Sequence, residues 1–248
     1  MFNDERFPSR VLEGIRPVLK YAAACTLAVI PLCPVIAGDD QIKGESQYRQ
    51  AIKMLESIQG TLNSVAIKIH AGADPAQFDE EGEIVRPVFA IVIENLQEAS
   101  DLGHPVAQYR FALPEFSFRR DWNANCKLLN QSVDQGFAPA AVQFAVCSPF
   151  ESKSHRVAQL KKAAADIERY AAYYPQPAVQ MSCNLDLPVN SLPQWGQKED
   201  YLAEIYLMLA QVSGRGTPER VQYFKEAVAA NGCAYAAKRL KYMQSSTQ

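Results

Sequence analysis

A block centred on a glycine turn recurs along this chain and constrains the fold more than any other feature. Its clearest copy lies between Asp121 and Phe150, where apolar residues at helical spacing precede Gly136: Leu128, Leu129 and Val133. Glycine readily takes the left-handed conformation with which many helices end. A second set of residues follows the turn at the spacing of one helix face: Ala140, Phe144 and Cys147. The block therefore predicts two antiparallel helices joined by a tight turn.

Further copies align on the turn glycine. Gly103 and Gly232 are each followed by an alanine and then by a large apolar residue, as Gly136 is: Ala107 and Phe111, Ala236 and Leu240, Ala140 and Phe144. A degenerate copy has Tyr174 at the glycine position and keeps Ala178. Turn positions 103 and 136 are 33 residues apart, and positions 136 and 174 are 38 apart. These intervals are typical of two-helix repeats, and the interval of 58 residues from 174 to 232 predicts an insertion.

These blocks resemble the Sel1-like repeat family, which is related to the tetratricopeptide repeat. The family pattern is an amphipathic helix ending in Ala-Ala-x-x-Gly, followed by a helix with small and aromatic residues. The segments EASDLG, QSVDQG and AVAANG stand at the helix ends here. The family's usual Leu-Gly pair is absent, since Phe111-Ala112 and Phe144-Ala145 occupy that place. The resemblance covers roughly Val88 to Met243 and implies an all-α fold, an α-solenoid of helical hairpins.

We divide the chain into three parts on this basis. Residues 1–37 resemble an export leader, residues 38–87 form an N-terminal helical segment with an acidic loop, and residues 88–245 carry the repeats, with an insertion near 184–199. The acidic loop is expected from Ala71 to Glu83, with helix resuming near Pro87. Prolines and glycine keep the insertion out of a helix. The helix predicted from Val157 to Tyr174 ends in tyrosines that either form a binding surface or pack against the next repeat.

The leader combines basic residues with an uncharged run from Tyr21 to Ala37 and small or short residues before Gly38. Pro31 and Pro34 disfavour a stable membrane-spanning helix in this run. A cleaved signal peptide would place the protein in a bacterial-type periplasm. The alternative is an uncleaved N-terminal anchor. No other membrane insertion is expected.

Cleavage after Ala37 leaves four cysteines, an even number that suggests disulfides in an exported protein. Cys126 lies ten residues before Gly136 and Cys147 lies eleven after it, so the two should face each other across the hairpin. The pairing of Cys183 with Cys233 follows by elimination. The alternative is four buried free thiols that pack as small hydrophobic groups.

Composition and motifs limit the chemistry. The formal net charge is −2 and the sequence pI is about 6.0, so nucleic acid is not expected as a partner. There is no Gly-x-Ser-x-Gly motif, no phosphate-binding glycine loop and no Cys-x-x-Cys pair, and the three histidines lie far apart. We therefore predict no catalytic residues, no metal and no cofactor. An acidic pair brought together only by the fold would still allow a helical enzyme of unknown reaction.

Two-helix repeats form an extended surface suited to holding another protein. In the family that the blocks resemble, the second helices tend to line the inner curve, with their apolar side turned to the packing. The remaining polar residues are the predicted partner-binding set: Gln108, Arg110, Gln143, Gln180, Lys238 and Arg239. Trp195 in the insertion adds an aromatic anchor. The alternative is that these side chains are merely solvated.

The resemblance implies a protein–protein interaction module. The first hypothesis for its role is an immunity protein that binds and neutralises a secreted antibacterial effector. The alternatives are an adaptor in envelope or exopolysaccharide assembly, and an enzyme with a helical fold. The genes beside this one would distinguish the first two roles.

Overall fold

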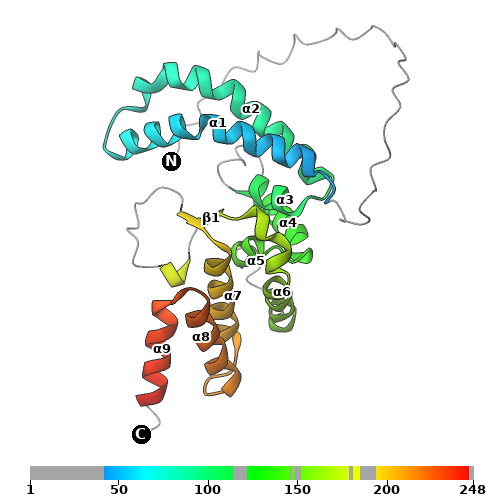
Figure 1. Ribbon diagram of the computed structural model, residues 1–248, viewed down its shortest axis with the longest axis vertical. Helices are drawn as coiled ribbons and strands as arrows, with labels where there is room; N and C mark the ends of the chain where they lie inside the picture. Colours follow the sequence, from blue (N-terminus) through cyan, green and yellow to red (C-terminus); the bar gives the residue numbers. More distant parts are fainter. Residues whose placement is uncertain are drawn as a thin grey trace, which may run out of the picture. The chain divides into compact units, whose positions relative to one another are not determined.

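The structure is a computed structural model that describes residues 42–113, 122–145, 147, 152–178, 181–184 and 194–245 (Figure 1). Across these ranges the chain is helical apart from one small two-stranded sheet, which confirms the all-α prediction. The expected leader at residues 1–37 lies outside the described residues. Within them, no helix combines the length and the apolar composition needed to cross a bilayer.

The first two long helices form an antiparallel pair. The helix α1 spans Glu45–His70, a 3-10 turn η1 spans Pro75–Phe78, and α2 spans Asp79–Asp101. At the start of α1, Gly44 has φ +82°, and a Cβ there would lie 2.9 Å from the Ala99 backbone near the end of α2. Only glycine permits both the left-handed conformation and this close approach.

The acidic segment is part of a helix, so the prediction of a loop from Ala71 to Glu83 is wrong over its second half. Asp79, Glu80 and Glu81 form the first turn of α2, where negative charge interacts favourably with the helix dipole. Pro87 lies inside α2, and the carbonyl that its missing N–H leaves unpaired is on the exposed Glu83. The boundary expected between residues 87 and 88 therefore falls within one continuous helix.

The glycine turns are confirmed. Gly103 joins α2 to α3 (Pro105–Ala112), Gly136 joins α4 (Trp122–Asp134) to α5 (Ala138–Phe144), and Gly232 joins α8 (Pro218–Asn231) to α9 (Ala234–Ser245). Their φ angles are +91°, +85° and +77°. At Gly136 a Cβ would also lie 2.2 Å from the Asp166 carboxylate.

The repeat positions that were expected to pack are buried. Ala107 and Ala140 are 0% exposed, and Phe111 and Phe144 are 8% and 9% exposed. The hairpins also contact each other, since α3 packs on α4 and α5 packs on α7. Ser132 of α4 donates a hydrogen bond to the Pro105 carbonyl of α3 at 2.8 Å.

The degenerate third copy does not form a helical hairpin. The helix α6 spans Lys153–Ala165 and a 3-10 helix η3 spans Ile167–Tyr173, but a strand β1, Gln176–Ala178, follows in place of a second helix. Pro175 and Pro177 lack the N–H groups that a helix needs here. The strand pairs antiparallel with β2, Gln194–Gly196, which lies in the predicted insertion.

The C-terminal helices enclose a second, smaller apolar cluster. The helix α7, Lys198–Val212, packs on α8, and α8 begins at Pro218 with the Thr217 hydroxyl accepting from the Arg220 N–H. The cluster combines residues of α7, α8, α9 and the short 3-10 turn η4 (Ser182–Asn184): Cys183, Ala203, Leu207, Phe224, Ala227 and Ala236. Thr217 caps α8 and Pro218 occupies its first turn, residue types that helix starts favour.

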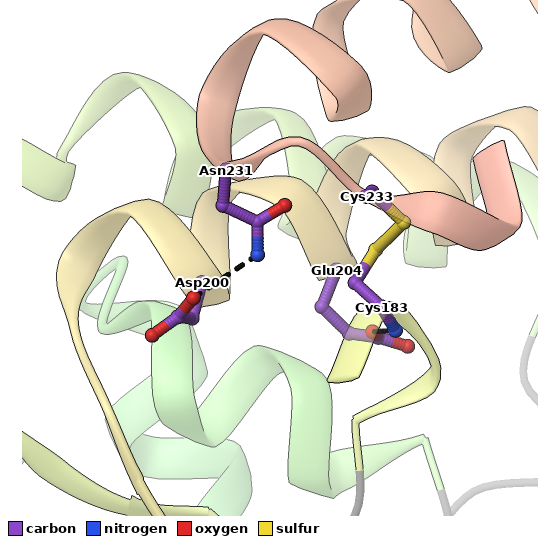
Figure 2. Close-up of a disulfide and its surroundings, with 5 residues drawn as sticks. All are labelled: Cys183, Asp200, Glu204, Asn231 and Cys233. Carbon is purple, nitrogen blue, oxygen red and sulfur yellow. Dashed lines mark hydrogen bonds between the residues drawn. A yellow bond between two sulfur atoms is a disulfide. The ribbon is translucent and has the colours of Figure 1, made fainter. Parts of the chain in front are cut away.

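Both predicted disulfides are present. Cys126 bonds to Cys147 across the α4–α5 hairpin, and Cys183 bonds to Cys233, linking η4 to the start of α9. Figure 2 shows Glu204 beside the second bond, with its carboxylate accepting from the Cys183 N–H at 3.1 Å. These bonds are consistent with an oxidising compartment.

Candidate functional site

A pocket of about 230 Å³ lies among α1, α3, η3 and β2. The residues that line it include Tyr48, Arg49, Leu55, Arg110, Tyr173 and Trp195. We call this the Arg110 pocket. Aromatic and aliphatic groups line much of it, and two arginines bring positive charge, a combination that suits an amphipathic ligand.

The first arginine is already neutralised. Arg49 Nε lies 2.5 Å from Glu45 Oε1, one helical turn earlier on α1, and the Arg49 guanidinium lies over the Tyr173 ring. The same Glu45 carboxylate accepts from Tyr173 Oη at 2.5 Å and contacts His104 Nε2 at 2.8 Å. We call these four residues, Glu45, Arg49, His104 and Tyr173, the Glu45 network.

The pKa values reflect this arrangement. Burial alone would raise the pKa of the Glu45 carboxyl, but the hydrogen bonds of the network hold it below its ordinary value. Burial lowers the pKa of His104 against the opposing attraction of Glu45. Burial and the carboxylate together raise the pKa of Tyr173 well above its usual range. The network is therefore an ionised carboxylate held by neutral donors and one arginine.

His104 has no free ring nitrogen. Its Nδ1 accepts from the Ala107 N–H at 3.3 Å and caps α3, so Nε2 carries the proton that is donated to Glu45. The ring is fully buried and stacks on Tyr48 with centroids 4.6 Å apart. In this geometry His104 positions helices and offers no base to a substrate.

Arg110 is the second arginine of the pocket and has no such compensation. It is 4% exposed, yet no carboxylate in the described part of the chain lies within ion-pair distance of it. Its Nε donates to Gln176 Oε1 at 2.7 Å, and its Cζ lies 5.1 Å from the centre of the Trp195 ring. No described residue accepts a hydrogen bond from the terminal nitrogens, so within the described structure four of the five N–H donors of the guanidinium remain for a ligand.

The structure corrects the orientation expected for two predicted partner-binding residues. Gln108 and Arg110 were expected on a free polar face, but each is 4% exposed because every residue of α3 is buried. Gln108 contacts the Ser100 carbonyl near the end of α2 and Gln135 just after α4. Arg110 lines the pocket, where it meets the predicted aromatic anchor Trp195, which is 44% exposed.

The other predicted residues lie elsewhere. Gln143 is half-buried on α5, and Lys238 and Arg239 are exposed on α9, where Arg239 donates to the Tyr235 hydroxyl at 2.8 Å. Gln180 lies outside the described residues. Gln143, Lys238 and Arg239 do not line the Arg110 pocket. Whether any of them binds a partner stays a prediction.

Sequence reasoning missed the α1 wall of the pocket. The Glu45–Arg49 spacing of four residues was the available signal, since it places an acid and a base on one helix face. Tyr173 was noticed only as one of several tyrosines at a helix end. In the ranges that the structure describes, no group of three His, Cys, Asp or Glu side chains could hold a metal ion.

The chain matches no protein-family model, no curated protein and no solved structure. The Sel1-like resemblance thus rests on the repeat residues themselves.

Proposed function

We propose that this chain is a partner-binding module of the bacterial periplasm, built as an α-solenoid of the Sel1-like type. Three glycine-turned hairpins at Gly103, Gly136 and Gly232 support the repeat assignment. Two disulfides and the leader-like segment at residues 1–37 support export.

One observation carries the binding role. Trp195 is exposed at the Arg110 pocket and stands against a buried arginine. Tryptophan and arginine are the residue types most enriched among the anchors of protein interfaces. The Trp195 ring is 44% exposed and offers apolar area that a partner can cover.

The role proposed within this class is that of an immunity protein, which covers a functional surface of a secreted effector. The resemblance to exported Sel1-like proteins supports it. An effector gene beside this one would add support, and a polysaccharide operon would favour the adaptor role.

Affinity capture from periplasmic extract tests the proposal. The full chain is immobilised in parallel with its Trp195→Ala variant and with Trp122→Ala as a matched control, because Trp122 is also exposed, at 54%, but lies outside the pocket. We expect one protein to be retained by the wild type and the control, and to be reduced at least tenfold by Trp195→Ala. Equal retention by all three forms would contradict binding through Trp195.

A further inference from the structure

We propose that the Arg110 pocket is a receptor for a single carboxylate presented by a peptide segment next to an apolar side chain. The inference rests on the proposed function for the source of that carboxylate, a partner protein. The site itself is argued from Arg110 and its surroundings.

The charged groups of the pocket favour a monoanion over a dianion. Arg49 is neutralised by Glu45 at 2.5 Å, so of the two pocket arginines it is Arg110 that has no carboxylate at ion-pair distance among the residues described. Burying an unpaired charge is unfavourable, and proteins normally pair it or bind an ion with it. Glu56 also lines the pocket and would repel the second charge of a phosphate dianion. Glu56 is not within ion-pair distance of Arg110, so the place beside the guanidinium is open to one carboxylate.

The hydrogen-bond geometry fits the same ligand. Gln176 Oε1 takes the Arg110 Nε proton and fixes one edge of the guanidinium. Gln176 is itself fully buried and donates to the Tyr173 carbonyl, so the position of Arg110 is set before any ligand arrives. The paired terminal nitrogens that remain match the two oxygens of a carboxylate.

The walls of the pocket favour a carboxylate attached to an apolar group. Ile52 and Leu55 of α1 line one wall. The Trp195 ring adds an aromatic surface beside the guanidinium. A volume of about 230 Å³ has room for one such residue and not for a large cofactor. A chain-terminal residue or an acidic side chain with an apolar neighbour would present this chemistry.

Binding of small probes to the full chain tests the site without a partner. In a Trp122→Phe background Trp195 is the remaining tryptophan of the two, and its fluorescence reports on the pocket. The probes are N-acetyl-leucine, its uncharged amide N-acetyl-leucinamide, N-acetylglutamic acid α-amide and inorganic phosphate. We expect saturable binding of N-acetyl-leucine, at least tenfold weaker binding of its amide, and weaker binding of phosphate.

The two carboxylate probes distinguish the sources. Tighter binding of N-acetyl-leucine indicates a chain terminus, and tighter binding of the glutamate derivative indicates an acidic side chain; either result supports the proposal. The proposal would be overturned by measurable and equal binding of N-acetyl-leucine and its amide, by phosphate binding more tightly than both carboxylate probes, or by no response to any probe up to about 10 mM, about tenfold weaker than a millimolar Kd.

Variants assign the effect to Arg110. Arg110→Met should weaken N-acetyl-leucine binding at least tenfold, and Arg110→Lys, which keeps the charge but not the paired donors, by a smaller factor. Arg215→Met is the matched control, because Arg215 is exposed and lies outside the pocket. Unchanged binding by Arg110→Met would overturn the assignment. Because the wild-type comparison of acid and amide needs no variant, a folding defect in Arg110→Met leaves the proposal falsifiable.

Failure of this inference can be told from failure of the proposed function. If the probes do not bind but partner capture still depends on Trp195, the pocket proposal is wrong and the function stands. If N-acetyl-leucine binds through Arg110 but no partner is captured, the pocket stands and the function is wrong.

Discussion

Members of the Glu45 network and Arg110 line the same pocket. They differ in whether an opposite charge within the fold compensates their own. Glu45 is surrounded by donors from three elements: Arg49 of α1, His104 at the start of α3 and Tyr173 of η3. Within the described residues the Arg110 side chain makes one hydrogen bond, to Gln176, and its guanidinium lies over the Trp195 ring. Both groups lie in the part of the chain where α1, α3 and η3 meet.

The difference separates a structural role from a binding role. A buried charge whose hydrogen-bonding capacity is filled within the fold holds elements together, because removing it leaves its partners unpaired. A buried charge with unused donors contributes little to the stability of the free protein and much to the stability of a complex. The comparison therefore predicts a large loss of stability on replacing Glu45 and only a small change on replacing Arg110.

The largest effect is expected on replacing Glu45. Glu45→Ala removes the shared acceptor of Arg49, His104 and Tyr173 and should lower the free energy of unfolding by about 3 kcal/mol, the range for charged hydrogen bonds to partly buried groups. Urea denaturation followed by circular dichroism measures this. Glu56→Ala is the control, since Glu56 is exposed on the same helix and should change stability by less than about 0.5 kcal/mol. A similar loss in both variants would mean that the network is not structural.

Acidification should weaken the network with a definite sign. The folded pKa of His104 lies below its ordinary value, so the unfolded state binds protons more readily, and stability falls as the pH drops below about 6.5. The pKa of Glu45 is also lowered, so its contribution is present above its unfolded pKa and is lost as the pH falls through the folded value. Urea midpoints measured between pH 8 and pH 4 test this.

The His104→Asn variant separates the contribution of His104 from that of Glu45. Asparagine keeps the capping acceptor for α3 but does not titrate, so the decline that begins below about pH 6.5 should shrink. If the wild type and the variant lose stability in parallel over this range, His104 is not responsible for the decline.

The smallest effect is expected for Arg110. Arg110→Met should change the free energy of unfolding by no more than about 1 kcal/mol, because relief of an unpaired buried charge offsets the lost hydrogen bond to Gln176. The contrast with Glu45→Ala is measured in the same denaturation series. A loss as large as that of Glu45→Ala would show that Arg110 stabilises the fold as Glu45 does. The proposed difference between the two residues would then be wrong.

Local signals predicted the parts of the fold that depend on neighbours in sequence. Gly103, Gly136 and Gly232 end helices with positive φ because that requirement is set within one turn. The Cys126–Cys147 bond follows from the same hairpin, since residues equally far from Gly136 must meet.

The pocket could not be predicted in this way because long-range contacts build it. The helix α3 was expected to keep a polar face, yet the Tyr109 hydroxyl donates to the Pro177 carbonyl and Arg110 contacts Gln176, so β1 covers that face. The β1–β2 pairing that sets Trp195 opposite Pro177 joins β1 to a strand that lies within the predicted insertion. The spacing of residues within α3 does not predict these contacts.

Nitrogen-15 NMR of the arginine side chains is the most direct test of whether Arg110, and not Arg49, is available to a ligand. It observes the two pocket arginines separately in one sample. During a titration with N-acetyl-leucine, the Arg110 side-chain N–H resonances should shift and saturate, while those of Arg49, already held by Glu45, should move much less. Resonances that shift equally for Arg49, Arg110 and the exposed Arg215, or that do not move at all, would contradict the claim that Arg110 is the uncompensated charge of this pocket.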